Sequence, residues 1–192
     1  MTSRIAFLGG ISGIGKSFAA KRWAEKARQL DVVAFSELML RHLPGIQDHR
    51  AIVSTTSPEE RAAARRLAIA DLGEVQKPTL VTGHYGICTF SRGGGVQAVE
   101  TAFPGELLPV VTALMLADHE DLAVVLDRRR TPKNPGALAE VEFERTVEGA
   151  IFTYLAAVSG KPAATVGLDR PDSGAAAVGF LQEQWPDIMN AV

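Results

Sequence analysis

The sequence predicts an α/β fold in three layers, in which helices cover both faces of a central five-stranded parallel sheet. Short apolar runs alternate with helical stretches along the chain, which is typical of such a sheet. A glycine-rich turn follows the first apolar run and precedes the first helical pattern. The 192 residues, 46% hydrophobic and 22% charged, are enough for one compact domain spanning residues 1–192.

The predicted strands are the apolar runs, and a parallel sheet places all their carboxyl ends on one side. They cover residues 5–8, 31–35, 77–83, 108–116 and 163–168. Ligands of open parallel sheets bind beyond the carboxyl ends of the strands. We therefore expect ligand-binding residues in the glycine-rich turn, in the Ser36–Met39 segment, in the Gly83–Gly95 loop and after the fourth strand.

The predicted helices follow from periodicity and from capping signals. The helix beginning at Ser57 has the clearest start, because Ser57 as N-cap, Pro58 at the first position and Glu60 form a capping box. We expect this helix to end near Gln76. The other predicted helices cover residues 16–30, a short stretch from Ser36, a stretch capped by Asp118, residues 136–158 and residues 173–184. In the first of them the inward residues are expected to be Phe18, Ala19, Trp23 and Ala27. In the helix over 136–158, the residues near one face are Leu138, Val141, Ile151, Leu155 and Val158.

The turn from Gly10 to Ser17 spells Gly-x-x-x-x-Gly-Lys-Ser, the pattern of a P-loop. Its glycines let successive backbone N–H groups point into a concavity, to which the following helix adds its positive end. We therefore expect ATP to bind there, with Lys16 on the β- and γ-phosphates and the Ser17 hydroxyl on Mg²⁺. The predicted nucleotide-binding residues are Gly10, Ser12, Gly13, Ile14, Gly15, Lys16, Ser17 and Phe18.

An arginine run indicates a lid. Arg128, Arg129 and Arg130 precede a segment rich in helix breakers, from Thr131 to Gly136. A hinged lid over residues 128–136 would bring guanidinium groups onto the transferring phosphoryl group. We predict Lys16, Arg128 and Arg129 as catalytic residues, while a solvated helix end is the alternative for the arginines.

The order of motifs resembles that of the adenylate kinase group of P-loop kinases, and most of all the archaeal-type adenylate kinases. The motifs are the phosphate loop, Val33–Met39, Ser57–Glu60 and Thr82–His84, and the resemblance covers about residues 4–168. It implies an acceptor-binding segment over about residues 36–76. Ser36, Met39, Arg50 and His84 are the predicted acceptor-binding residues, although a structural role for His84 is equally open.

The sequence also departs from that family. Thr82 stands where the family usually has an acidic residue, and Arg50 lacks a second arginine beside it. The leading hypothesis is an ATP- and Mg²⁺-dependent kinase of a nucleoside monophosphate or a related nucleotide. The alternatives are a P-loop kinase of a small hydroxyl-bearing metabolite, with Glu37 as base, and a non-catalytic ATP-binding switch.

Composition excludes several other classes. The net charge of −2 does not provide the excess of positive charge that is typical of proteins that bind a nucleic-acid duplex. Cys88 is the single cysteine, so we expect no disulfide framework, and we interpret it as a small buried residue. His42 and His49 lack metal-ligand companions, and no run of 18 apolar residues suggests a membrane span. We expect a cytoplasmic protein whose partners are ATP and a small acceptor.

Overall fold

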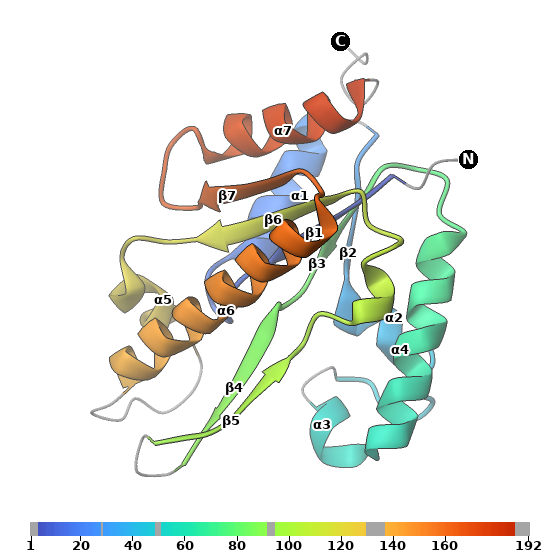
Figure 1. Cartoon of the computed structure of the whole chain (residues 1–192), viewed down its shortest axis with the longest axis vertical. Coiled ribbons are helices and arrows are strands. Elements are labelled where there is room, and N and C mark those ends of the chain that lie inside the picture. The colour runs from blue at the N-terminus through green and yellow to red at the C-terminus, as the bar shows by residue number, and fades with distance from the viewer. Residues whose placement is uncertain (1–3, 28, 49–50, 92–94, 130–136, 187–192) are drawn as a thin grey trace.

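A computed structural model of the chain describes residues 4–27, 29–48, 51–91, 95–129 and 137–186. Five parallel strands form one sheet in the order β2-β3-β1-β6-β7 (Figure 1). Their bounds are β1 Ile5–Gly9, β2 Asp31–Ala34, β3 Thr79–Thr82, β6 Ala113–Asp118 and β7 Ala163–Gly167. Phe7 of β1 lies between Val81 of β3 and Leu114 of β6. The predicted five-stranded parallel sheet is confirmed.

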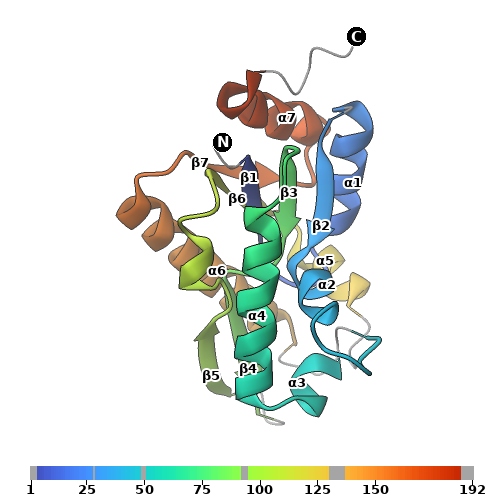
Figure 2. The same cartoon turned by 90° about the vertical axis from the view of Figure 1, so that its right-hand side faces the viewer.

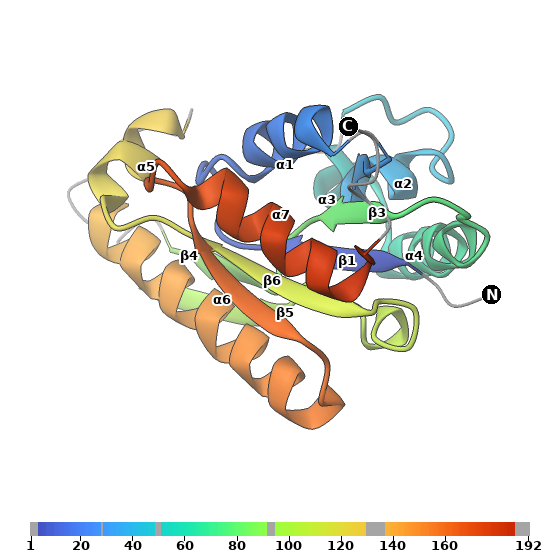
Figure 3. The same ribbon diagram turned by 90° about the horizontal axis from the view of Figure 1, so that it is seen from above.

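Helices cover both faces of this sheet (Figures 2 and 3). On one face lie α1 and α7, and on the other lie α4 and α6. The helices are α1 Lys16–Lys26, α2 Phe35–Leu40, α3 Ile52–Thr55, α4 Pro58–Gly73, α5 Leu122–Arg128, α6 Ala137–Ser159 and α7 Ser173–Gln184. The capping box at the start of α4 is confirmed, because Ser57 Oγ accepts from Glu60 N–H and Glu60 Oε2 accepts from Ser57 N–H.

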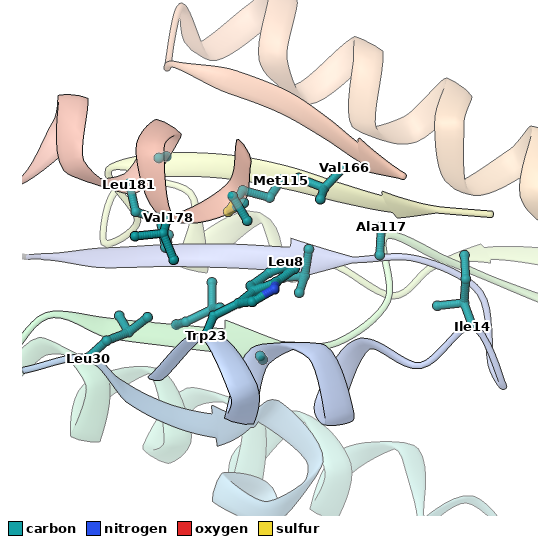
Figure 4. Packing of buried hydrophobic residues seen from close by; sticks show 14 of the residues in the cluster. Leu8, Ile14, Trp23, Leu30, Met115, Ala117, Val166, Val178 and Leu181 are labelled. Carbon is teal, nitrogen blue, oxygen red and sulfur yellow. The ribbon is translucent and has the colours of Figure 1, made fainter. Parts of the chain in front are cut away.

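The core has two layers because side chains alternate along each strand. Leu8 of β1 points to the face under α1 and α7, where it packs with Trp23 and Met115 (Figure 4). Phe7 points to the opposite face, where it packs edge-on against Tyr85 and Phe103. Helix α6 contributes to both layers, with Val141 in the layer of Leu8 and Phe152 and Leu155 in the layer of Phe7.

A two-stranded antiparallel sheet corrects the interpretation of residues 83–95 as a loop. It consists of β4 Gly86–Phe90 and β5 Val96–Thr101, and it packs against α6. Cys88 lies on β4 and is only half-buried, so the interpretation of Cys88 as a small buried residue is wrong.

Several helix and strand predictions also need correction. The fourth predicted strand begins at Ala113 rather than Leu108, because the backbone amides of Leu107, Leu108, Val110 and Val111 turn back to nearby carbonyls around a short 3₁₀ helix, Gly105–Leu107. The first helix ends at Lys26, and its Phe18 is 69% exposed rather than inward. Leu138 and Val158 of α6 are likewise exposed, whereas Val141 and Leu155 are buried as predicted.

The cap of α5 is Asp121, not Asp118. Asp121 Oδ1 accepts from the N–H groups of Ala123 and Val124. Among the described residues, no helix combines the length and the apolar character that crossing a membrane requires.

Candidate functional site

The phosphate loop lies between β1 and α1, at the point where the sheet topology reverses direction. β3 lies on one side of β1 and β6 on the other, and ligands of open α/β sheets bind at such a switch point. Gly10 and Gly13 have φ values of +143° and +81°, which favour glycine. A Cβ on Gly10 would approach the Ala117 carbonyl oxygen to 2.7 Å, so this position has no room for a side chain.

The start of α1 leaves its backbone donors available to an anion. Its N-cap is Gly15, in the left-handed conformation, so no side chain caps the first turn. The unpaired N–H groups of a helix start and the positive end of its dipole together attract phosphate. Ser12 and Ser17 are exposed beside this turn.

Lys16 folds back into the loop. Its side chain is buried, and Nζ donates to the carbonyl oxygens of Gly10 and Ile11, the latter at 2.9 Å. Burial lowers the pKa of Lys16 from 10.5 to about 8, while the Glu148 carboxylate opposes that shift. The ammonium group thus occupies the concavity where a polyphosphate would lie.

Two arginines of the predicted lid contact the phosphate loop from the end of α5. Arg129 Nε donates to Ser12 O at 3.0 Å, and its Nη2 lies 2.5 Å from Glu144 Oε2 of α6. Arg128 Nη1 donates to Ile14 O at 3.4 Å. Arg129 therefore joins the phosphate loop to α6. Arg130 and the rest of the predicted lid, residues 131–136, lie outside the described residues.

A pocket of about 300 Å³ lies between the end of β3, helices α2 to α4 and the β4–β5 sheet. Its walls are largely apolar, with Phe7, Phe35, Met39, Ile52 and Ile87 among them. Its polar side chains are Ser36, Arg61, Arg65, His84, Glu100 and Thr101. The pocket therefore combines Ser36, Met39 and His84 of the predicted acceptor residues.

The two arginines of this pocket come from one face of α4. Arg61 Nη1 donates to Thr56 O at 2.6 Å. Arg65 is half-buried, and within the described part of the chain its buried Nε has no hydrogen-bond partner. Both arginines line the pocket rather than a purely solvated helix face. Arg50 lies outside the described residues, so its predicted role stays a prediction.

His84 follows β3 and contacts a buried carboxylate that sequence reasoning missed. Its Nδ1 lies 2.9 Å from Glu148 Oε1, and the other oxygen, Oε2, accepts from Tyr85 N–H at 2.7 Å. Glu148 is 2% exposed. One signal could have revealed it: Val141, Glu148, Phe152 and Leu155 follow helical spacing, so a carboxylate stands in an apolar stripe.

Other residues considered from the sequence lie elsewhere. Glu37 is exposed on α2 and does not line the pocket, so its candidacy as a base is not supported. Asp118 accepts two hydrogen bonds from Arg145, both at 2.6 Å. His42 Nε2 lies 2.8 Å from Asp71 Oδ2, away from the pocket lining.

A second hollow, of about 240 Å³, lies along the outer side of α1 near the loop after β7. It is lined by Phe18, Arg22, Trp23, Arg170 and Pro171, among others. The Arg22 guanidinium lies 5.7 Å from the centre of the Phe18 ring. An exposed aromatic ring beside the start of α1 offers a stacking surface near the phosphate loop.

The donor set suits a metal ion that arrives with a nucleotide. The Ser17 hydroxyl is exposed at the loop, and the described residues hold no group of three His, Cys, Asp or Glu side chains that could bind a metal. Phosphate oxygens would have to supply most of the ligands of Mg²⁺.

Solved structures share the fold. Shikimate kinase from Bacteroides thetaiotaomicron aligns with a TM-score of 0.62 at 12% identity, covering 94% of this chain and 96% of that chain. Shikimate kinase from Acinetobacter baumannii in complex with shikimate aligns with a TM-score of 0.61 at 10% identity, covering 96% and 93%. A gluconokinase from Sinorhizobium meliloti aligns with a TM-score of 0.52 at 16% identity, covering 96% and 95%.

Comparison with models of protein families finds no match. Comparison with curated proteins finds no matching sequence. At these low identities the likeness shows the fold alone, an α/β fold with a five-stranded parallel sheet that this chain shares with shikimate kinases and a gluconokinase. The resemblance to archaeal-type adenylate kinases stays a prediction.

Proposed function

We propose that this chain is an ATP-dependent phosphotransferase whose acceptor is a small hydroxyl-bearing metabolite with an anionic group. The observation that carries the proposal is the pocket at the end of β3, which is largely apolar but contains Arg61 and Arg65. A pocket of about 300 Å³ matches a small molecule. Guanidinium groups bind carboxylate or phosphate with paired hydrogen bonds, so they favour an anionic acceptor.

The donor side of the proposal rests on the phosphate loop. The triphosphate would accept hydrogen bonds from the loop and from the start of α1, and Lys16 would leave its carbonyl partners to contact the β- and γ-phosphates. Ser17 would hold Mg²⁺, which neutralises charge on the phosphates when bound. Arg128 and Arg129 would approach the transferring group, and Phe18 would stack on the nucleotide base.

The solved structures of similar fold are named for shikimate and gluconate, which are hydroxyl-bearing molecules, and this supports the hydroxyl acceptor over the nucleotide. A nucleoside monophosphate remains the second candidate. It is favoured by the order of sequence motifs and by the same two arginines, which could hold an acceptor phosphate.

A screen of acceptor-dependent ADP release tests the proposal. The panel contains hydroxy acids, sugar acids, neutral sugars and nucleoside monophosphates, each with ATP and Mg²⁺. We expect stimulation by one of the anionic hydroxyl compounds. Stimulation by monophosphates alone would favour the second candidate, and tight ATP binding without stimulation by any acceptor would indicate a switch protein.

A further inference from the structure

We infer that His84 accepts the proton of the acceptor hydroxyl, and that Glu148, from the distant helix α6, positions it by fixing its tautomer. The inference rests on the proposed function, because a phosphate acceptor is already ionised and needs no base. In this arrangement His84 is the catalytic residue and Glu148 is a positioning residue.

Geometry assigns the two roles. His84 lines the acceptor pocket, and its side chain is 35% exposed, so the ring is accessible to a bound molecule. Glu148 lies behind it, almost fully buried, and does not line the pocket. The contact between them uses Nδ1, which leaves Nε2 as the ring nitrogen available to the acceptor.

The hydrogen bonds that Glu148 accepts then place the proton of His84 on Nδ1. A carboxylate offers only acceptors, and the Tyr85 N–H already donates to Oε2. Oε1 can therefore pair with His84 only if Nδ1 carries the proton. In a neutral imidazole the other nitrogen, Nε2, must then have a free lone pair. This is the form that a general base requires.

The charges around His84 keep the ring neutral. Burial and the positive charge of Lys16 lower the pKa of His84 from its ordinary value of 6.5, and the nearby carboxylates Glu148 and Glu144 only partly oppose them. Arg61, Arg65 and Glu100 also line the pocket that His84 faces. At neutral pH the imidazole is consequently ready to take a proton.

Proton transfer to His84 accompanies phosphoryl transfer to the acceptor. The acceptor O–H bond breaks and its proton moves to His84 Nε2, while the oxygen lone pair forms a bond to the γ-phosphorus of ATP. The bond between the γ-phosphorus and the bridging oxygen breaks, and its electron pair leaves with ADP. The imidazolium stabilised by Glu148 returns its proton to water after the products depart.

Glu148→Gln gives the sharpest test because it can be scored without any acceptor. The Tyr85 N–H can only donate, so it would keep the single amide oxygen, and the amide NH₂ would face His84 Nδ1. Nδ1 must then become an acceptor, and the proton moves to Nε2. We expect ¹⁵N NMR of the free protein to show His84 protonated at Nδ1 in the wild type and at Nε2 in the variant. A wild-type Nε2–H tautomer would overturn the inference.

His84→Asn tests the base itself, because asparagine can still donate to Glu148 but cannot accept the proton at the Nε2 position. With the best hydroxyl acceptor we expect kcat to fall by about 100-fold or more, with little change in ATP affinity. Wild-type kcat should decline as pH falls through the lowered pKa of His84, below 6.5, and this limb should be missing in the variant. The matched control is Asp71→Asn, which alters the other histidine–carboxylate pair, at His42, and should change neither kcat nor the pH profile.

The outcomes separate the inference from the proposed function. If a hydroxyl acceptor is found but His84→Asn raises only KM, His84 binds the acceptor and the inference is wrong while the function stands. If no hydroxyl acceptor stimulates ADP release, the function and the base role both fail. The tautomer measurement would then still report on the His84–Glu148 pair, since it needs no substrate.

Discussion

Lys16 is held by two backbone carbonyls in a place where it has almost no contact with water. We predict that Lys16→Met, which keeps the apolar stem, lowers kcat by about 100-fold or more because the charge on the transferring phosphate loses its partner. Lys21→Met is the matched control, since Lys21 is exposed on the same helix. Steady-state ADP release measures both, and near-native turnover of Lys16→Met would contradict the kinase proposal.

The lowered pKa of Lys16 also predicts proton uptake when ATP binds. At a pH near 8 about half of the Lys16 side chains are neutral in the free protein. The polyphosphate stabilises the ammonium form and raises that pKa, so binding should take up about half a proton at pH 8 and less at pH 6.5, where Lys16 is already charged. Calorimetry in buffers of different ionisation enthalpy measures the uptake. Equal uptake by Lys16→Met would assign it to another group.

At the scale of single elements, capping determines where α4 begins. We predict that Ser57→Ala lowers the free energy of unfolding by about 1 kcal/mol, because the Glu60 N–H loses its acceptor. Ser57→Thr should retain most of the stability. Urea unfolding measures both variants, and identical midpoints for wild type and Ser57→Ala would show that the capping box contributes nothing.

A second prediction concerns the two arginines at the end of α5. Arg129 bridges Ser12 of the phosphate loop and Glu144 of α6, whereas Arg128 makes one long hydrogen bond to Ile14. Arg129→Ala should therefore weaken ATP binding or turnover more than Arg128→Ala does. ATP titration and kcat for both variants decide this, and equal, negligible effects would mean that these arginines form a solvated helix end.

Local signals explain which elements the sequence predicts. The α4 start needs only residues 57–60, and the five strands are apolar runs, so both follow from short windows. The sequence does not predict the β4–β5 sheet because the stretch between the two strands is rich in glycine, although β4 contains Ile87, Thr89 and Phe90 and β5 contains Val96, Val99 and Thr101. The prediction of Asp118 as a cap is wrong because its partner in the structure, Arg145, lies 27 residues further along the chain.

At the scale of the whole molecule, function depends on contacts between distant segments. The phosphate loop is one continuous stretch of sequence, so its pattern can be recognised without any long-range contact, and the roles of its residues stay predictions. The acceptor pocket draws on α2, α3, α4, β4 and β5, and the His84–Glu148 pair spans 64 residues. No local pattern encodes such a pairing. The one sequence signal for the His84–Glu148 pair is Glu148 itself, a carboxylate within the apolar stripe of α6.

The last prediction concerns Arg65, which lines the proposed acceptor pocket, and its independence from ATP binding. Arg65 lies on α4, which packs in the layer with Phe7, whereas α1 packs in the opposite layer with Leu8. The described residues that line the pocket of Arg65 include none of the phosphate loop, so replacing Arg65 should leave the contacts of that loop intact. Arg65→Met should therefore raise KM for an anionic acceptor by about 10-fold or more while ATP affinity stays unchanged.

Arg66→Met is the matched control, because Arg66 is exposed on α4 beside Arg65 but does not line the pocket. Steady-state kinetics with the best acceptor, together with ATP titration, compares the two variants. Because the guanidinium is expected to pair with the anionic group of the acceptor, an acceptor analogue lacking that group should bind the wild type and Arg65→Met equally. If both arginine variants behave alike, or if Arg65→Met changes ATP affinity instead, the anion-binding role of this pocket is wrong.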